Sequence, residues 1–275
     1  MDEVINFFSE NYHCRDCFNN NGITINYANR EGKKTFERFR TANVKGPQPR
    51  WIGKNYFKSK KRICFMLINP GSGKNTPDKD WEPLKVLSTE NNQKEKENLW
   101  VELMTVNKEG MKNWGAWKRL YLDSFGLDEG GKLEEVGFMN KMLCAAWYLD
   151  KYGNFPNAYN QNSLRNCFKL NSHLLLRILS PKHLIFSGRE TIVSILKKPR
   201  ELSMSKVENS KHMHIKYFRE SMGPKSRELN PSDVKDEIRD CLDQDVRYFF
   251  MGHYGQSVTS EDFKDAGIIK DQIGI

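Results

Sequence analysis

Long apolar stretches are absent from this sequence. None in the 275-residue chain approaches the roughly 18 residues of a membrane-spanning helix. The first residues, MDEVINFFSENYHC, are acidic and lack the basic and apolar regions of a secretory signal. No repeat with a period of roughly 20 to 50 residues is present, which excludes solenoids and propellers. We therefore expect a cytoplasmic protein without a membrane partner.

Cysteine is scarce, with 6 residues in the chain. Because cytosolic thiols stay reduced, we expect core residues, metal ligands or reactive thiols rather than disulfides. Cys64 and Cys241 are isolated and are predicted to be buried core residues. The remaining candidates form a possible four-thiolate site, which suits zinc or an iron–sulfur cluster. They are Cys14, Cys17, Cys144 and Cys167.

Acidic residues are too few to balance the basic ones. The chain has 44 Lys and Arg against 35 Asp and Glu, a formal charge of +9. Such a charge indicates an anionic partner or simply a basic surface. In residues 45–61 the basic residues are interleaved with aromatic ones, which favours nucleic acid over a membrane surface. We expect a monomer that binds DNA.

Four short apolar stretches predict the strands of one sheet, at residues 62–68, 136–139, 183–187 and 246–251. Helical spacing follows at 189–198, and residues 164–179 predict a helix that packs on the core through Leu170, Leu174, Leu175 and Ile178. Strands that alternate with helices imply a parallel sheet covered on both faces. We predict a three-layer α/β/α sandwich around a central, mostly parallel four-stranded sheet.

The domain organisation predicted from composition is a single domain over residues 1–275. Residues 1–50 precede the first predicted strand and form an N-terminal extension. Residues 199–240, approximately, are polar and charged and are expected to be a surface insertion.

Each predicted strand is followed by a polar or glycine-containing turn. The four turns begin at Asn69, Asn140, Gly188 and Gly252. Ordinary turn chemistry explains any one of them. In an open α/β sheet, however, ligands bind at the carboxyl ends of the strands, so the four turns together predict one crevice.

The turn after the first strand must be tested as a phosphate-binding P-loop. Residues 68–75 read INPGSGKN, with Ile68 at the place of the first glycine and Asn75 at the place of the magnesium-binding hydroxyl. No apolar stretch ends in the Asp that would hold the metal. A P-loop-like NTPase is therefore the less favoured alternative.

Asn69-Pro70-Gly71, at the end of an apolar strand, resembles the water-activating motif of the uracil-DNA glycosylase superfamily, in particular its mismatch and thymine glycosylase branch. Asn140 and Cys144 are similar to the N-x-x-x-C segment of the iron–sulfur branch. Cys167, the following helix and residues 180–188 also resemble that branch. Cys14-Arg15-Asp16-Cys17 stands at the place of its N-terminal C-x-x-C, and residues 252–257 at the place of its late His-Pro-Ser motif, with Tyr254 instead of proline.

The resemblance implies a DNA glycosylase that flips a deaminated or modified pyrimidine out of DNA and hydrolyses its N-glycosidic bond. The product is an abasic site, made in base-excision repair or in defence against modified phage DNA. A 4Fe-4S cluster on the four cysteines is also implied, with zinc as the alternative. A catalytically weak DNA-binding module of the same fold remains open.

The resemblance also implies roles for individual residues. Asn69 positions the attacking water, and His253 donates to the base oxygen that gains negative charge. Asn140 reads the base edge, because an amide offers both a donor and an acceptor. Trp81 is the candidate for stacking on the flipped base. The other expected substrate-binding residues are Pro70, Gly71, Ser72, Gly73, Gly188, Tyr254 and Ser257.

Overall fold

The computed structural model describes residues 1–14, 24–28, 34–38, 43–68, 78–147, 165–197, 219–220, 222–252 and 258–275. The chain divides into two compact units, which are described separately. Unit 1 comprises Met1–Arg50, Asn69–Val106 and Asn140–Leu175. Unit 2 comprises Trp51–Ile68, Asn107–Met139 and Leu176–Ile275.

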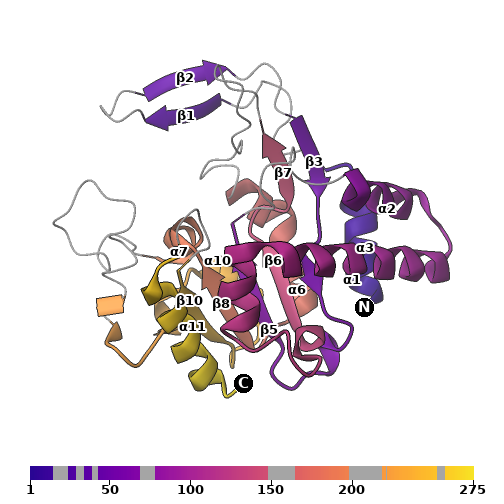
Figure 1. Cartoon of the computed structure of the whole chain (residues 1–275). Coiled ribbons are helices and arrows are strands. Elements are labelled where there is room, and N and C mark those ends of the chain that lie inside the picture. The colour runs from indigo at the N-terminus through magenta and orange to yellow at the C-terminus, as the bar shows by residue number, and fades with distance from the viewer. Residues whose placement is uncertain are drawn as a thin grey trace. The chain divides into compact units, whose positions relative to one another are not determined.

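Unit 2 is built on a six-stranded sheet with the strand order β4-β6-β5-β8-β10-β9. Its strands are β4 (Trp51–Ile52), β5 (Ile63–Leu67), β6 (Val136–Asn140), β8 (His183–Ser187), β9 (Glu228–Leu229) and β10 (Arg247–Met251). Figure 1 labels the strands β5, β6, β8 and β10 of this sheet. β8 pairs in parallel with both β5 and β10. The two-residue strands β4 and β9 pair antiparallel at the edges, with β6 and β10 respectively.

The four predicted strands are confirmed, and so is the three-layer α/β/α class. Each is a run of apolar residues, and all five residues of β5 are buried. Such runs indicate strands that are covered on both faces. The structure extends β6 to Asn140 and adds β4 and β9, which the sequence did not predict.

Aromatic side chains fill the core on one side of β5 and β6 in unit 2. The ring of Phe65 stacks on Phe138 with centroids 4.5 Å apart. Tyr121 and Phe125 meet Phe65 edge-on, at 5.8 and 5.1 Å. Aromatic pairs of this kind contribute about 0.5–1.5 kcal/mol each beyond the area that they bury. They fix the π-helical segment η3 (Lys118–Asp123) against the sheet.

Helices flank the sheet in unit 2. The longest one wholly within this unit is α11 (Ser260–Ile273), which packs on β10 and on η3. A capping box between Thr259 and Asp262 begins this helix, and Gly274 ends it with a φ of 73°. The shorter helical segments are η1 (Tyr56–Lys58), α4 (Gly115–Trp117), η4 (Lys132–Glu135), α7 (Arg189–Ile195), η6 (Pro231–Asp233) and α10 (Asp236–Arg239).

Unit 1 contains α1 (Asp2–Asn11), α2 (Asp78–Thr89) and most of α3 (Gln93–Asn113). Phe8 of α1 stacks on Trp100 of α3 at 5.8 Å, and the Ser9 hydroxyl donates to the Leu87 carbonyl at 3.0 Å. Two antiparallel strand pairs complete this unit. They are β1 (Thr24–Ala28) with β2 (Lys34–Arg38), and β3 (Asn43–Pro47) with β7 (Cys144–Trp147).

The prediction of which side chains in residues 164–179 face the core is only partly correct. The segment contains a π-helical turn, η5 (Phe168–Ser172), followed by α6 (His173–Leu179). Leu175 is buried as expected, but Leu170 and Leu174 are 45% and 38% exposed. The π-helical turn shifts the periodicity, because it adds a residue to the turn. The buried face is instead formed by Cys167, Phe168, Asn171, Ser172, Leu175, Leu176 and Leu179.

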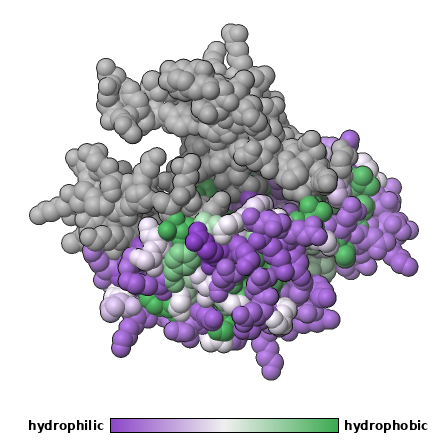
Figure 2. All heavy atoms as spheres, in the orientation of Figure 1, coloured by the Kyte–Doolittle hydropathy of each residue, from purple (hydrophilic) through white to green (hydrophobic). Residues whose placement is uncertain are grey.

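The second half of the predicted insertion 199–240 contains regular structure. It carries β9, η6 and α10, and the side chains of Leu229, Val234 and Ile238 are buried. In the orientation of Figure 2 the described surface is mostly hydrophilic, with hydrophobic residues scattered over it. In the described ranges, no helix combines the length and apolarity needed to cross a membrane.

Candidate functional site

Hydrogen bonds tie together the carboxyl ends of β8 and β10 in unit 2. The Ser187 hydroxyl donates to the Gly252 carbonyl at 2.9 Å and lies 2.5 Å from the Tyr121 hydroxyl. The N–H of Gly188 donates to the Met251 carbonyl at 3.1 Å. These residues are buried, so the two strand exits are held in a fixed geometry.

Two glycines are required at these exits. Gly188 has a φ of 93°, a conformation that strongly favours glycine. At Gly252 a Cβ atom would lie 1.8 Å from the Asp262 carboxylate oxygen Oδ1. Because Gly252 has no side chain, the Asp262 and Asp265 carboxylates of helix α11 can approach the backbone where β10 ends. The sequence placed Gly188 and Gly252 at strand ends, and the structure confirms both positions.

A buried ionic cluster lies under the end of β10. The Asp265 carboxylate is fully buried and accepts hydrogen bonds from the guanidinium groups of Arg219 and Arg227. It also accepts from the N–H of Gly252 at 3.3 Å. Arg219 donates further to Asp262 at 2.7 Å. Paired charges of this kind satisfy one another in a site where an isolated charge would be very costly.

The sequence pattern did not predict this cluster. Its only signal is the i, i+3 pair Asp262 and Asp265, together with two arginines in the segment predicted to be a surface insertion. The cluster anchors Gly252 and so fixes the point from which residues 253–257 begin.

Asn140, the last residue of β6, has a side chain with no hydrogen-bond partner in the described part of the chain. The residue is 0% exposed, and both Oδ1 and Nδ2 of its amide are without a partner. An unsatisfied buried polar group costs about 1–3 kcal/mol, and most buried polar groups are paired. The amide therefore has a free donor and a free acceptor side by side, the pattern that pairs with the edge of a nucleobase.

The segments that carry three of the four candidate metal ligands contact one another in unit 1. The Asn171 amide donates to the Cys14 sulfur at 3.1 Å, and the Cys144 sulfur lies 4.0 Å from the Cys14 carbonyl oxygen. The Leu143 N–H donates to the Cys167 sulfur at 3.3 Å. N–H groups that point at sulfur stabilise thiolates and tune the metals that they bind.

These contacts do not form a complete set of metal ligands. Within the described ranges, no group of three His, Cys, Asp or Glu side chains is arranged to hold a metal ion. The fourth candidate, Cys17, lies outside those ranges. No disulfide joins the cysteines that the structure describes.

The two remaining cysteines differ in their burial. Cys64 is fully buried in β5, and burial raises the pKa of its thiol well above the ordinary value. The prediction of a core residue is confirmed there. For Cys241 it is wrong, because this residue is only partly buried and its sulfur lies 3.1 Å from the Glu237 carbonyl oxygen of α10. Its position after a short surface helix leaves one side open to solvent.

Most of the other expected site residues lie outside the described residues. They are Asn69, Pro70, Gly71, Ser72, Gly73, His253, Tyr254 and Ser257. Each belongs to a segment that directly follows a described strand, β5 or β10. Trp81 lies on α2, but the structure does not describe its side chain.

Comparison with known proteins gives no match. No protein-family model, no curated protein and no solved structure matches the chain significantly.

Proposed function

We propose that the protein is a DNA glycosylase, which hydrolyses the N-glycosidic bond of a deaminated or modified pyrimidine and leaves an abasic site. The observation that carries this proposal is the Asn140 amide, fully buried at the end of a sheet strand with neither polar atom paired. A ligand that pairs with this amide would offset the cost of its desolvation. A flipped pyrimidine presents a matching donor and acceptor on its edge.

The proposal assigns the chemistry to residues in the segments that follow β5 and β10 in the sequence. Asn69 orients a water molecule toward the anomeric carbon of the sugar. His253 donates to the base oxygen on which negative charge develops as the glycosidic bond breaks. The fixed backbone of Gly252, held by Asp265, supports this role because it anchors the residue before His253.

DNA is the proposed partner, and the surplus of basic residues supports it. With a formal charge of +9, the protein attracts a polyanion and releases counterions when it binds. The proposed setting is base-excision repair or defence against phage DNA that carries modified bases. A monomer in the cytoplasm is part of the same proposal.

We also propose that Cys14, Cys17, Cys144 and Cys167 hold a 4Fe-4S cluster, with zinc as the alternative. The contacts among the segments that carry Cys14, Cys144 and Cys167 support this. The cluster's proposed role is structural, joining the N-terminal residues to the segment after β6.

A base-release assay tests the proposed function. Duplexes that contain one uracil, one mismatched thymine or one hydroxymethylated cytosine are incubated with the protein, treated with alkali and examined for strand breaks. We expect breaks at one of these bases. Binding of all duplexes without breaks would indicate the DNA-binding module instead, and magnesium-dependent ATP hydrolysis would indicate an NTPase.

A further inference from the structure

A cavity of about 690 Å³ lies in unit 2, at the edge of the sheet where β5 and β6 begin. Ile63 and Val136, the first residues of these two strands, form its floor together with Leu127, and all three are buried. The proposed glycosylase residues follow the opposite ends of the strands. The cavity is therefore a separate site, and its volume is typical of sites for small molecules.

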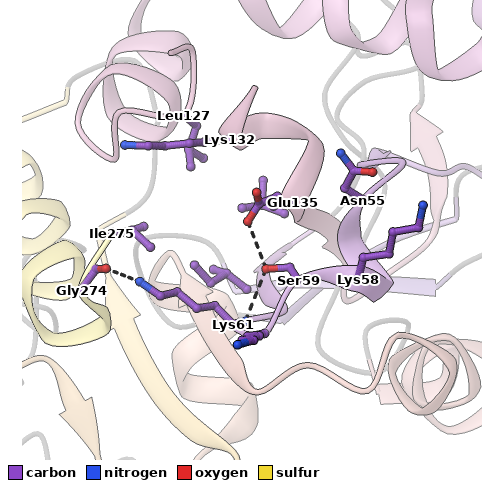
Figure 3. A pocket seen from close by; sticks show the side chains of 12 residues that line it. Asn55, Lys58, Ser59, Lys61, Leu127, Lys132, Glu135, Gly274 and Ile275 are labelled. Atoms are coloured by element: carbon purple, nitrogen blue, oxygen red, sulfur yellow. Dashed lines mark hydrogen bonds between the residues drawn. The ribbon is translucent and has the colours of Figure 1, made fainter. Parts of the chain in front are cut away.

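Lysines surround this apolar floor. Lys58, Lys60 and Lys61 come from the segment before β5, and Lys132 from η4. Among the lining residues, Glu135 has the only acidic side chain, and it accepts a hydrogen bond from the Ser59 hydroxyl at 3.3 Å (Figure 3). Within the described residues, none of these four lysines forms an ion pair with a carboxylate.

Two of the ammonium groups, those of Lys61 and Lys132, lie toward one end of the cavity, whereas Lys58 points toward the other end (Figure 3). The Lys61 amine donates to the Gly274 carbonyl, and Figure 3 draws the Lys61 and Lys132 amines on the side of Gly274. The amines of Lys132 and Lys270 both lie close to Gly126, 4.0 and 3.3 Å from the position of a Cβ there. Lysines outnumber the acidic side chains in this lining. Like charges repel one another, and a bound anion relieves this repulsion.

We propose that this cavity binds a small molecule that carries a diphosphate, of the size of a nucleoside diphosphate. Lys61 and Lys132 contact the phosphates, since lysine ammonium groups bind phosphate as point charges. The apolar floor of Ile63, Leu127 and Val136 receives the uncharged part of the ligand. Glu135 accepts a hydrogen bond from a ligand hydroxyl at the edge of this floor.

Calorimetric titration with ADP, pyrophosphate and adenosine tests this proposal on the full-length protein. We expect ADP to bind more tightly than pyrophosphate, because only ADP also covers the apolar floor, and adenosine to bind at least about 10-fold more weakly than ADP. Equal binding of ADP and pyrophosphate would contradict a site for an organic diphosphate. Failure of ADP to bind at millimolar concentration would overturn the proposal entirely.

The double variant Lys61→Gln/Lys132→Gln locates the site. We expect it to weaken ADP binding at least about 10-fold, because two charge-assisted contacts are lost. Lys94→Gln/Lys96→Gln is the matched control, since it removes the same charge from an exposed and a partly exposed position near the beginning of α3 and should leave ADP binding unchanged. Thermal unfolding of both variants checks that they fold, and Lys61→Arg/Lys132→Arg, which retains the charges, should keep most of the affinity.

The alternative interpretation is that Lys61 and Lys132 contact duplex DNA and not a small diphosphate. If Lys61→Gln/Lys132→Gln lowers DNA affinity while ADP binds neither protein, these lysines contact DNA and the proposal is wrong. Equal ADP affinity in the variant and the wild type would also overturn it. Neither result bears on base release, so the test is independent of the proposed glycosylase activity.

Discussion

The Asp265 carboxylate accepts a hydrogen bond from the backbone N–H of Gly252, at 3.3 Å, and thereby connects helix α11 to the end of β10. The same carboxylate neutralises Arg227, which is only 4% exposed. Asp265→Ala should lower the free energy of unfolding by about 3–5 kcal/mol, because it leaves a buried arginine without its partner. Denaturant titration measures this loss.

Glu261 provides the control for Asp265 on the same helix. It pairs with Lys264, and both side chains are largely exposed to solvent. Glu261→Ala should therefore leave the free energy of unfolding nearly unchanged. Equal effects of the two substitutions would mean that the buried cluster does not anchor the strand end.

Asn140→Leu separates a ligand-binding amide from a structural one. The two side chains are similar in size, and leucine removes two buried polar atoms that have no partner in the described structure. We expect the free energy of unfolding to stay equal or to rise by about 1 kcal/mol, while base release falls at least about 10²-fold. A clear loss of stability would show that the amide supports the fold.

His183 gives the fold a pH dependence. Burial lowers the pKa of its imidazole, and the hydrogen bond from Nδ1 to the Lys61 carbonyl, at 2.8 Å, offsets this only in part. As pH falls through the ordinary histidine value of about 6.5, the unfolded chain takes up a proton that the folded protein resists. Stability should thus decrease from pH 7.5 to 5.5.

Replacing His183 tests whether this residue carries the effect. His183→Gln keeps a donor for the Lys61 carbonyl but does not titrate. Its stability should change less with pH over this range than that of the wild type. An identical pH profile would assign the loss of stability to other groups.

The proposed 4Fe-4S cluster would give the purified protein a colour. Protein purified without oxygen should be brown and absorb near about 400 nm, and Cys144→Ser should remove both properties. Cys64→Ser is the control, because Cys64 lies inside β5 and away from the proposed ligand set. Zinc in place of iron would select the alternative metal, and the absence of both would contradict the ligand assignment.

The central strands could be predicted because their apolar sequence runs coincide with the segments that are buried in the folded sheet. β8 occupies the predicted residues 183–187, and its apolar run ends at a glycine. β4 and β9 were missed because two residues carry no periodicity, and only their neighbours β6 and β10 define them as strands. Leu170 and Leu174 were placed wrongly because a π-helical turn is invisible in a 3.6-residue pattern.

In the candidate site, too, features with a local sequence pattern could be predicted, and features that depend on contacts between distant segments could not. Asn140 and Gly188 could be placed at strand ends from sequence, because polar residues interrupt apolar runs there. The contact between Arg219 and Asp265 joins residues 46 apart, and no local pattern indicates it. The gathering of Lys61, Lys132 and Lys270 likewise depends on how three separate segments fold.

The most direct test of the account compares base release by the wild type and by Asn69→Ala on the same DNA. Single-turnover assays are run with the duplex that the wild type cleaves after alkali treatment, and DNA affinity is measured in parallel. We predict nearly equal affinity and at least about 10²-fold slower release by the variant, which corresponds to roughly 2.7 kcal/mol of barrier. Release at the wild-type rate would contradict the account, because Asn69 would then be only a turn residue.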